Sequence, residues 1–304
     1  MIVTTPAEFR AAYSPERYPA TAPATARGAF LVTPVDFKLA AESAKDNVYM
    51  AMRERVDAAR ALSEHAALAS ALRELLPTVT FPGDALTPDA LFPNNVFATT
   101  PGRLIVGAMR HAVRRREAER RDIREFFHDL LKYEIVDLST ESITAELTGS
   151  LVIDRARGIG YCGLSERCDM AGARAMHAAF GLKLMFCFEL ARGEYHTNVV
   201  LAILASRAAI IAADGFADTQ VVDAIAQVYA PHVVHLDAEQ KAAFAANAIS
   251  LTRDSVCMSR RAAASVDTDQ RATLKAAGFK LHSVELGEIE KAGGSLRCCV
   301  GEIY

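Results

Sequence analysis

The 304-residue chain is 51% hydrophobic and carries a formal net charge of −3, with a pI near 6.3. This composition can fill the core of a globular protein. Because a basic excess is missing, the chain lacks the general electrostatic attraction to phosphate that polynucleotide binding needs, so we expect no nucleic-acid partner.

The sequence indicates neither export nor insertion into a membrane. Its start, MIVTTPAEFRAAYSPER, lacks the basic-then-apolar order of a secretory signal. Its most apolar stretch is interrupted by Ser206 and Arg207 well before the roughly 20 residues that a membrane-spanning helix needs. We therefore expect a cytoplasmic protein whose six cysteines stay reduced. His232 and His235 lie in an alternating, strand-like run without a second ligand pair, so we expect no metal site.

The first quarter of the chain predicts two segments of different character. Residues 1–29 are rich in Ala, Pro and Thr, and they predict an irregular lead-in before a strand at AFLVT. Residues 41–76 contain neither Gly nor Pro and are rich in Ala, Leu and charged side chains. This composition predicts a helix that ends before Pro77.

The rest of the chain repeats one pattern: two short strands around a turn, an amphipathic helix and one more strand. The helices are expected over residues 112–132, 167–181, 217–229 and 261–277. The first strands begin 54, 49 and 49 residues apart, near Asn95, Gly149, Asn198 and Asn247.

One further step along the chain reaches Leu296, which makes SLRCCVGEI the predicted first strand of a fifth unit. Its remaining parts would come from the other end of the chain, namely AFLVT and the helix after Ala41. A period near 50 residues is typical of radial or stacked repeats, and completion by both termini favours a ring. We therefore predict one α/β domain over residues 1–304.

In such a ring, the residues just before each first strand converge at one mouth. These residues are Asn94, Asn95, Glu146, His196, Asn247 and Cys298. A carboxylate, an imidazole and a thiol at equivalent repeat positions indicate a catalytic site.

Cys298 is the candidate nucleophile, because Arg297 and a nearby imidazole would lower the pKa of its thiol. Cys299 is expected to pack in the core, since successive strand residues face opposite sides. His196 is the candidate general acid and base. The basic run RHAVRRREAERRD has acids interleaved at helical spacing, and it predicts a solvated, salt-bridged helix face.

Six ordered motifs resemble those of the guanidine-modifying, or pentein, superfamily. They are FPNNVFATT, REAERR, AELTGSLVIDR, YHTNV, FAANA and GGSLRCCVGEI. Within the superfamily, the chain looks most like the arginine deiminase-related citrulline utilization hydrolases, which are related to dimethylarginine dimethylaminohydrolase and the amidinotransferases. The resemblance extends from about Ala29 to the last residue.

The resemblance implies a five-bladed α/β propeller of ββαβ units and a site that needs no metal or organic cofactor. It implies that Cys298 is the nucleophile, that His196 is the acid and base, and that Glu146 orients the nitrogen atoms of the substrate. We expect the small-molecule substrate to be contacted by Asn94, Asn95, Asn198, Asn247 and Arg297.

The chain departs from the family pattern at the pocket. The pattern FPNNWFSTH has Trp and His where this chain has Val96 and Thr100, and Leu147 replaces a glycine. The deiminases of the superfamily hold a guanidinium with two carboxylates, whereas FPNN would offer an amide beside the single acid Glu146. Amides can bind a neutral ureido group, so we expect citrulline to be preferred over arginine.

Three functions remain open at this point. The first is a hydrolase that cleaves a carbon–nitrogen bond of a citrulline-, arginine- or methylarginine-like compound. The second is an amidinotransferase, in which an amine replaces water at the covalent intermediate. The third is a ligand-binding protein that kept the ring but lost catalysis through Leu147 and Thr100. The sequence is also compatible with a homodimer.

Overall fold

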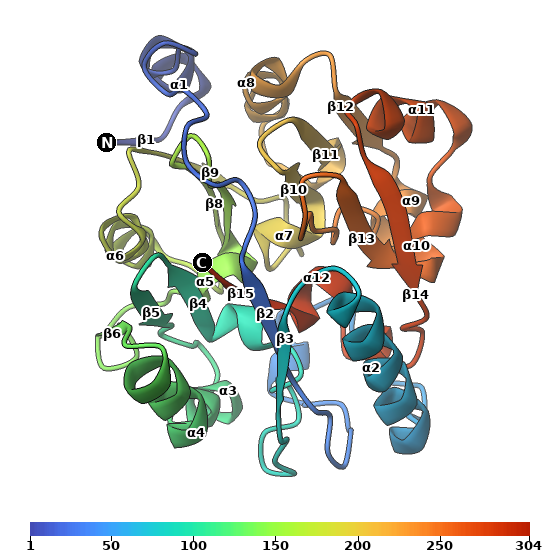
Figure 1. The fold of residues 1–304 in the computed structure, drawn as a ribbon. Helices are drawn as coiled ribbons and strands as arrows, with labels where there is room; N and C mark the ends of the chain where they lie inside the picture. The colour runs from blue at the N-terminus through green and yellow to red at the C-terminus, as the bar shows by residue number, and fades with distance from the viewer.

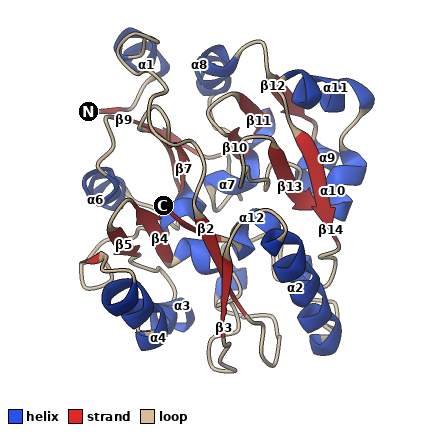
Figure 2. Cartoon of the chain, in the orientation of Figure 1, coloured by secondary structure: helices blue, strands red, loops and turns tan.

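The computed structural model describes all 304 residues, and its strands form five small sheets. Figure 2 shows these sheets in red around a middle occupied by short helices, with most of the longer helices outside them. The sheets are β4 (Phe97–Thr100), β5 (Arg103–Val106) and β6 (Glu134–Asp137); β7 (Leu151–Asp154), β8 (Ile159–Leu164), β9 (Leu184–Glu189) and β1 (Ile2–Val3); β10 (Leu201–Leu204), β11 (Ala208–Ala212) and β12 (Val233–Leu236); β13 (Ser255–Ser259) and β14 (Lys280–Val284); and β15 (Gly301–Ile303), β2 (Gly28–Val32) and β3 (Thr78–Phe81).

The helices fall into an outer and an inner group. The outer helices are α1 (Pro6–Ala12), α2 (Ala58–Arg73), α3 (Ala112–Ala118), α4 (Arg121–Glu125), α6 (Met170–Phe180), α8 (Thr219–Tyr229), α9 (Ala238–Ala242), α10 (Arg260–Ser265) and α11 (Thr268–Ala276). The inner helices are single turns, α5 (Leu147–Ser150), α7 (Thr197–Val200) and α12 (Leu296–Cys299). None of the helices combines the length and apolar composition needed to cross a lipid bilayer.

The strands confirm the predicted repeat. In four sheets the first two strands are antiparallel, and the third runs parallel to the second. In the sheet of β13 and β14, the first strand is reduced to an antiparallel bridge between Ile249 and Cys257. The predicted fifth unit is also confirmed, because β15 pairs with β2 from the other end of the chain, with Gly301 opposite Phe30. Figure 1 shows this pairing as red beside blue.

Short helical turns precede the first strands, and they are linked by hydrogen bonds. Backbone Arg297 donates to the Asn247 carbonyl at 3.3 Å, and the Asn247 side chain donates to the Asn198 carbonyl at 2.9 Å. The Asn198 side chain donates to the Thr148 carbonyl at 3.1 Å, and the Thr148 hydroxyl donates to the Asn94 carbonyl at 3.0 Å. These bonds join segments from residue 94 to residue 297, and the turns α5, α7 and α12 lie near the centre of the molecule (Figure 1).

Three predicted elements were wrong in detail. Cys298 lies on the helical turn α12 and not on a strand, which begins only at Gly301. The lead-in over residues 1–29 is partly regular: β1 pairs with β9, and α1 begins at a capping box in which Thr5 and Glu8 satisfy each other's backbone N–H groups. The Ala-, Pro- and Thr-rich composition of residues 1–29 led us to overlook the Thr5–Glu8 capping box that begins this short helix.

The helix predicted over residues 41–76 begins only at Ala58, where Asp57 caps it. The preceding residues 43–50, the cover segment, contain only a single 3₁₀ turn at Ser43–Lys45. Polar groups of this segment bind partners far away in the sequence instead of continuing a helix: Asp46 binds Arg167, and Asn47 binds the carbonyl of Gly293. Tertiary contacts therefore override the helical composition here.

Candidate active site

The side chain of Asn247 holds Cys298 at two points. Cys298 is 1% exposed, and its backbone N–H donates to Asn247 Oδ1 at 3.3 Å. Asn247 Nδ2 lies 3.2 Å from Cys298 Sγ, and Asn198 Oδ1 lies 3.8 Å from the same sulfur. We predicted that Asn247 would contact the substrate, but the structure places it against the candidate nucleophile, where its N–H can stabilise a thiolate.

His196 and Glu146 form a fully buried pair, with His196 Nε2 2.9 Å from Glu146 Oε2. A carboxylate accepts only, so this contact assigns the proton to Nε2 and leaves the lone pair on Nδ1. Nδ1 has no hydrogen-bond partner in the protein. The Tyr195 ring packs against the imidazole with 4.4 Å between centroids. The imidazole is thus held in place and can accept a proton at Nδ1.

Arg167 fixes the charge state of this pair. Burial would raise the pKa of Glu146, but the Arg167 guanidinium and the hydrogen bond to His196 hold that pKa well below its usual range. Arg167 Nη1 lies 3.1 and 3.3 Å from the two Glu146 oxygens. Burial lowers the pKa of His196, although the hydrogen bond that His196 donates to Glu146 opposes this shift. At neutral pH the pair is therefore a carboxylate and a neutral imidazole.

A small cavity lies beside Cys298. It has a volume of about 20 Å³, which is room for roughly one or two water molecules. Two oxygens of lining residues, Asp89 Oδ1 and Asn95 Oδ1, are buried without a hydrogen-bond partner. The other Asp89 oxygen accepts from the Ser43 hydroxyl at 2.5 Å. Unpartnered buried acceptors indicate a place where a ligand with N–H donors would bind.

Sequence reasoning missed four charged residues at this site: Asp46, Asp89, Arg114 and Arg167. Asp89 could have been noticed as the acid just before FPNN in TPDALFPNN. The sequence predicted that the helix carrying Arg114 and Glu117 presents its charged side chains to solvent. This was wrong for these two residues, which are 3% and 2% exposed. They form a two-point ion pair with both N–O distances at 2.9 Å. Arg167 gives no recognisable signal in the sequence.

The cover segment lies against the site, where Ser43 and Asn47 line the cavity, and contacts at both ends hold it there. Near its start, Arg167 Nη2 donates to the Ser43 carbonyl at 2.9 Å and lies 2.5 Å from Asp46. Near its end, the Tyr49 hydroxyl donates to Glu194 at 2.7 Å. Arg167 also binds both Glu146 oxygens, so the contacts near the start of the cover segment link it to the His196–Glu146 pair.

Arg297 does not lie at the site as predicted. Its guanidinium donates to the Val300 carbonyl and to Glu302, each at 3.0 Å, and it does not line the cavity beside Cys298. Asn94 and Asn198 likewise donate to the Thr148 carbonyl, so they build the central hydrogen-bonded layer. Of the five residues expected to contact substrate, Asn95 is the one that lines this cavity.

The expected lowering of the Cys298 pKa was also wrong. Burial raises the pKa of the thiol, and the hydrogen bond from Asn247 offsets this only in part. Alkylation of Cys298 by a neutral reagent such as iodoacetamide should therefore rise with pH through the neutral range, without a plateau below about pH 8.5, the ordinary thiol pKa. Peptide mass spectrometry at several pH values checks this. A plateau near pH 6–7 would contradict it, because that plateau marks a preformed thiolate.

A model of the eukaryotic N,N-dimethylarginine dimethylhydrolase family matches residues 33–304. The chain belongs to this family. It is thus a pentein-superfamily protein related to the arginine deiminases. A 22% identical relative, the uncharacterized protein YkgA of Bacillus subtilis, aligns over 78% of this chain and 77% of its own length.

Solved structures show that the dimethylarginine dimethylhydrolase-family chain has the α/β fold of known penteins. The substrate-bound N-terminal domain of ArgZ, a cyanobacterial arginine dihydrolase, matches with a TM-score of 0.78 at 17% identity, covering 91% of this chain and 97% of that domain. A dimethylarginine dimethylaminohydrolase adduct with 4-chloro-2-hydroxymethylpyridine matches with a TM-score of 0.71 at 21% identity, covering 91% and 100%. The chain spans 40% of full-length ArgZ.

Proposed function

We propose that this protein is a cysteine-dependent hydrolase that cleaves a carbon–nitrogen bond of a small guanidino compound. The observation that carries the proposal is the meeting of the Cys298 thiol and the unpartnered Asp89 carboxylate oxygen at one cavity, whose lining residues Arg167 and Tyr195 contact the buried His196–Glu146 pair. We further propose that the five sheets are the blades of a closed α/β propeller, with the site at one mouth of the ring. The central hydrogen-bonded layer supports this arrangement.

The chemistry follows from the protonation states of the site. A bound guanidinium brings positive charge to the thiol, which favours its ionisation, and His196 Nδ1 takes the proton. The thiolate attacks the central guanidinium carbon and forms an S–C bond. The C–N bond to one nitrogen then breaks, and the imidazolium protonates that nitrogen as it leaves as an amine. Glu146 stabilises the imidazolium throughout.

The second half of the reaction consumes one water molecule. The water adds to the carbon of the S-linked amidinium, and the S–C bond breaks. The product is a neutral ureido compound; of the two protons released, one goes to His196 and the other to the departing Cys298 sulfur, which restores the thiol. If an amine took the place of water, the reaction would be an amidinotransfer, so product formation that requires an added amine would identify that alternative.

We propose a cationic substrate, which reverses the preference for citrulline derived from the sequence. That preference assumed Glu146 as the single acid of the pocket, but Glu146 binds His196 and Arg167, and Asp89 is the carboxylate that lines the cavity. A guanidinium N–H matches its free oxygen. Arg114 also lines the cavity, and its Nη1 makes no hydrogen bond in the protein, so it can bind the carboxylate of an amino-acid substrate.

An isosteric change tests the role of Asp89. Asp89→Asn should raise KM for a guanidinium substrate by about tenfold or more, because an ion-assisted hydrogen bond is lost, with a smaller effect on any ureido compound. Steady-state kinetics with arginine, methylated arginines, agmatine and citrulline, following ammonia, methylamines and ureido product, measures both effects. Equal turnover of citrulline and arginine by the wild type would contradict the cationic preference.

A further inference from the structure

A large cavity lies between the N-terminal lead-in and the turns at the ends of two sheets. Its volume is about 450 Å³, within the roughly 300–1,000 Å³ that small-molecule sites occupy. Residues 22–27 form one wall, and the others are the β4–β5 turn, the β7–β8 turn, the end of α6 and Tyr304. This cavity, the lead-in cavity, shares no lining residue with the cavity beside Cys298, so the proposed reaction does not use it.

The charged side chains that line the lead-in cavity are all basic. They are Arg27, Arg155 and Lys183, and no Asp or Glu side chain lines it. The main-chain oxygen of Tyr304 accepts from the Tyr133 hydroxyl. Even when a terminal carboxylate on Tyr304 is counted, the basic groups are in excess. The lining therefore attracts anions.

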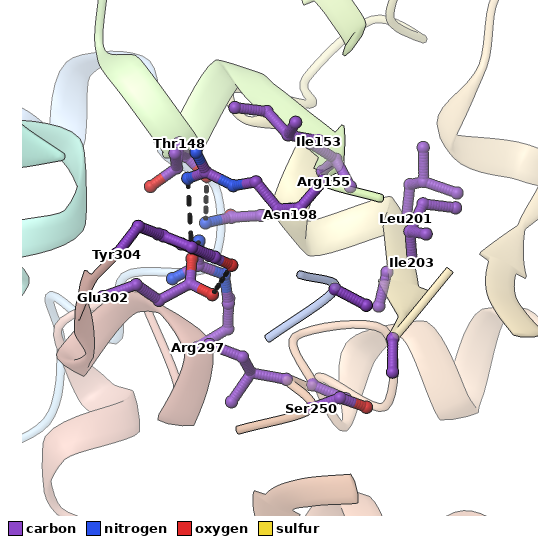
Figure 3. A pocket seen from close by; sticks show the side chains of 16 residues that line it. Thr148, Ile153, Arg155, Asn198, Leu201, Ile203, Ser250, Arg297, Glu302 and Tyr304 are labelled. Carbon is purple, nitrogen blue, oxygen red and sulfur yellow. Dashed lines mark hydrogen bonds and ion pairs between the residues drawn. The ribbon is translucent and has the colours of Figure 1, made fainter. Parts of the chain in front are cut away.

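Arg155 is a nearly buried cation whose hydrogen-bonding capacity is largely unused. Its side chain is 10% exposed, and its guanidinium carbon lies 4.1 Å from the centre of the Tyr304 ring. Nη1 donates to the Thr99 carbonyl at 3.0 Å, whereas Nη2 is 4.0 Å from Glu302, beyond hydrogen-bond distance. Glu302 accepts instead from Arg297 at 3.0 Å and from the Tyr304 hydroxyl at 2.8 Å (Figure 3). A carboxylate or phosphate group can use the free N–H groups of such a guanidinium.

The other two cations of the lead-in cavity are exposed and have no acidic partner in the protein. The Lys183 stem packs beside the β7–β8 turn, where a Cβ added to Gly158 would lie 3.3 Å from Lys183 Cγ. Arg27 Nη2 donates to the Tyr133 hydroxyl at 3.3 Å. Both charges are therefore available to an anion bound in the cavity.

The remaining lining of the lead-in cavity suits an apolar body better than water alone. Ile153, Phe180 and Leu182 line it together with Pro23. Covering these side chains with hydrocarbon is favourable, because it removes apolar surface from water. An inorganic ion would leave most of the 450 Å³ unfilled. The volume and the lining together favour an anionic group attached to an aromatic or aliphatic body.

We propose that the lead-in cavity is a second ligand site, which binds a small organic anion. A carboxylate or phosphate group of this ligand meets the Arg155 guanidinium, and its apolar body lies against Phe180 and Leu182. The site lies apart from Cys298, so it adds a binding function that does not depend on the proposed hydrolase reaction.

Isothermal titration calorimetry of the full chain tests the site with four probes. Two of them, 4-phenylbutyrate and phenyl phosphate, combine an aromatic body with an anionic group. The other two are comparators: 4-phenylbutyramide lacks the charge, and inorganic phosphate lacks the body. We expect at least one aromatic anion to bind with a Kd below about 1 mM, and both comparators to bind about tenfold more weakly than it does. The tighter of the two aromatic anions identifies the anionic group that the site prefers.

Variants at the three cations locate the binding. Arg155→Gln should abolish it. The double variant Arg27→Gln/Lys183→Gln neutralises two exposed charges and should raise Kd by about fivefold or more. Its matched control is Arg260→Gln/Lys280→Gln. These side chains are 68% and 78% exposed on the unit of β13 and β14, which does not line the cavity, so Kd should stay within about twofold of the wild type.

Four results would overturn the proposal. The first is no binding of either aromatic anion up to about 10 mM. The second is an amide that binds as tightly as the better aromatic anion, because the cavity would then be only an apolar pocket. The third is inorganic phosphate that binds as tightly, which marks an adventitious ion only. The fourth is the same Kd in the two double variants, which would place the binding elsewhere. The double variants decide this last point even if Arg155→Gln does not fold.

Discussion

Cys298→Ser should lower kcat for the guanidino substrate by about 10⁴-fold or more, the scale on which loss of a catalytic nucleophile acts. The hydroxyl is nearly isosteric and can still accept from Asn247 Nδ2, which lies 3.2 Å from the sulfur in the wild type. A serine hydroxyl is far less acidic than a thiol, so the nucleophile itself is lost while the packing around it is kept.

A matched variant at the neighbouring cysteine separates chemistry from folding. Cys299 is fully buried and belongs to the same apolar cluster, but it makes no hydrogen bond to Asn247. Cys299→Ala should lower the midpoint of thermal unfolding and leave kcat within a few fold of the wild type. If Cys298→Ser retained a tenth of the wild-type activity, Cys298 could not be the nucleophile.

Glu146→Gln should lower kcat by about 10³- to 10⁴-fold, as expected when an imidazole loses the carboxylate that fixes its tautomer. The glutamine amide carries no charge to stabilise an imidazolium. Its NH2 group can also donate to His196 Nε2, which would favour the other imidazole tautomer. Glu146 is ionised throughout the neutral range because its pKa is held low, so the wild type should show no loss of activity from protonation of this group above about pH 5.

Removing the buried charge of Glu146 also lowers the stability of the fold, which by itself would reduce the measured activity. The experiment therefore needs a control variant. Glu117→Gln breaks another buried arginine–carboxylate pair, and Glu117 does not contact His196. Because its partner Arg114 is proposed to bind the substrate carboxylate, an effect of this variant on the site should fall on KM and not on kcat. Glu117→Gln should show a similar loss of unfolding free energy with a much smaller fall in kcat. An equal fall in kcat for the two variants would contradict a specific role of Glu146 in positioning His196.

The repeat and the positions of the candidate site residues were predictable from the sequence, because each depends on local pattern. Strand alternation and turn residues mark the units, and the spacing of the units places Glu146, His196 and Cys298 at equivalent positions. The structure brings His196 and Glu146 to 2.9 Å and confirms that the fifth unit combines both ends of the chain.

The other parts of the candidate site depend on contacts between residues far apart in the chain, and such contacts leave no pattern in the local sequence. Arg167 looks like any loop arginine in SERCDM, yet it binds both Glu146 and Asp46, and Asp46 lies 121 residues before it in the chain. The cover segment has helical composition, but its hydrogen bonds to Arg167 and Gly293 hold it in a largely non-helical conformation. We predicted Arg297 at the site because it is adjacent to Cys298, but adjacent side chains on a helical turn diverge, and the Arg297 guanidinium binds Val300 and Glu302 instead.

The most direct test of the central claim is intact-protein and peptide mass spectrometry of wild type and Cys298→Ser, quenched within milliseconds of mixing with arginine or a methylated arginine. We expect one adduct per chain, located at Cys298, that forms together with the released amine, decays as ureido product appears and is absent from Cys298→Ser. Ureido product without any adduct at Cys298, or an adduct of equal yield in Cys298→Ser, would contradict covalent catalysis at this residue.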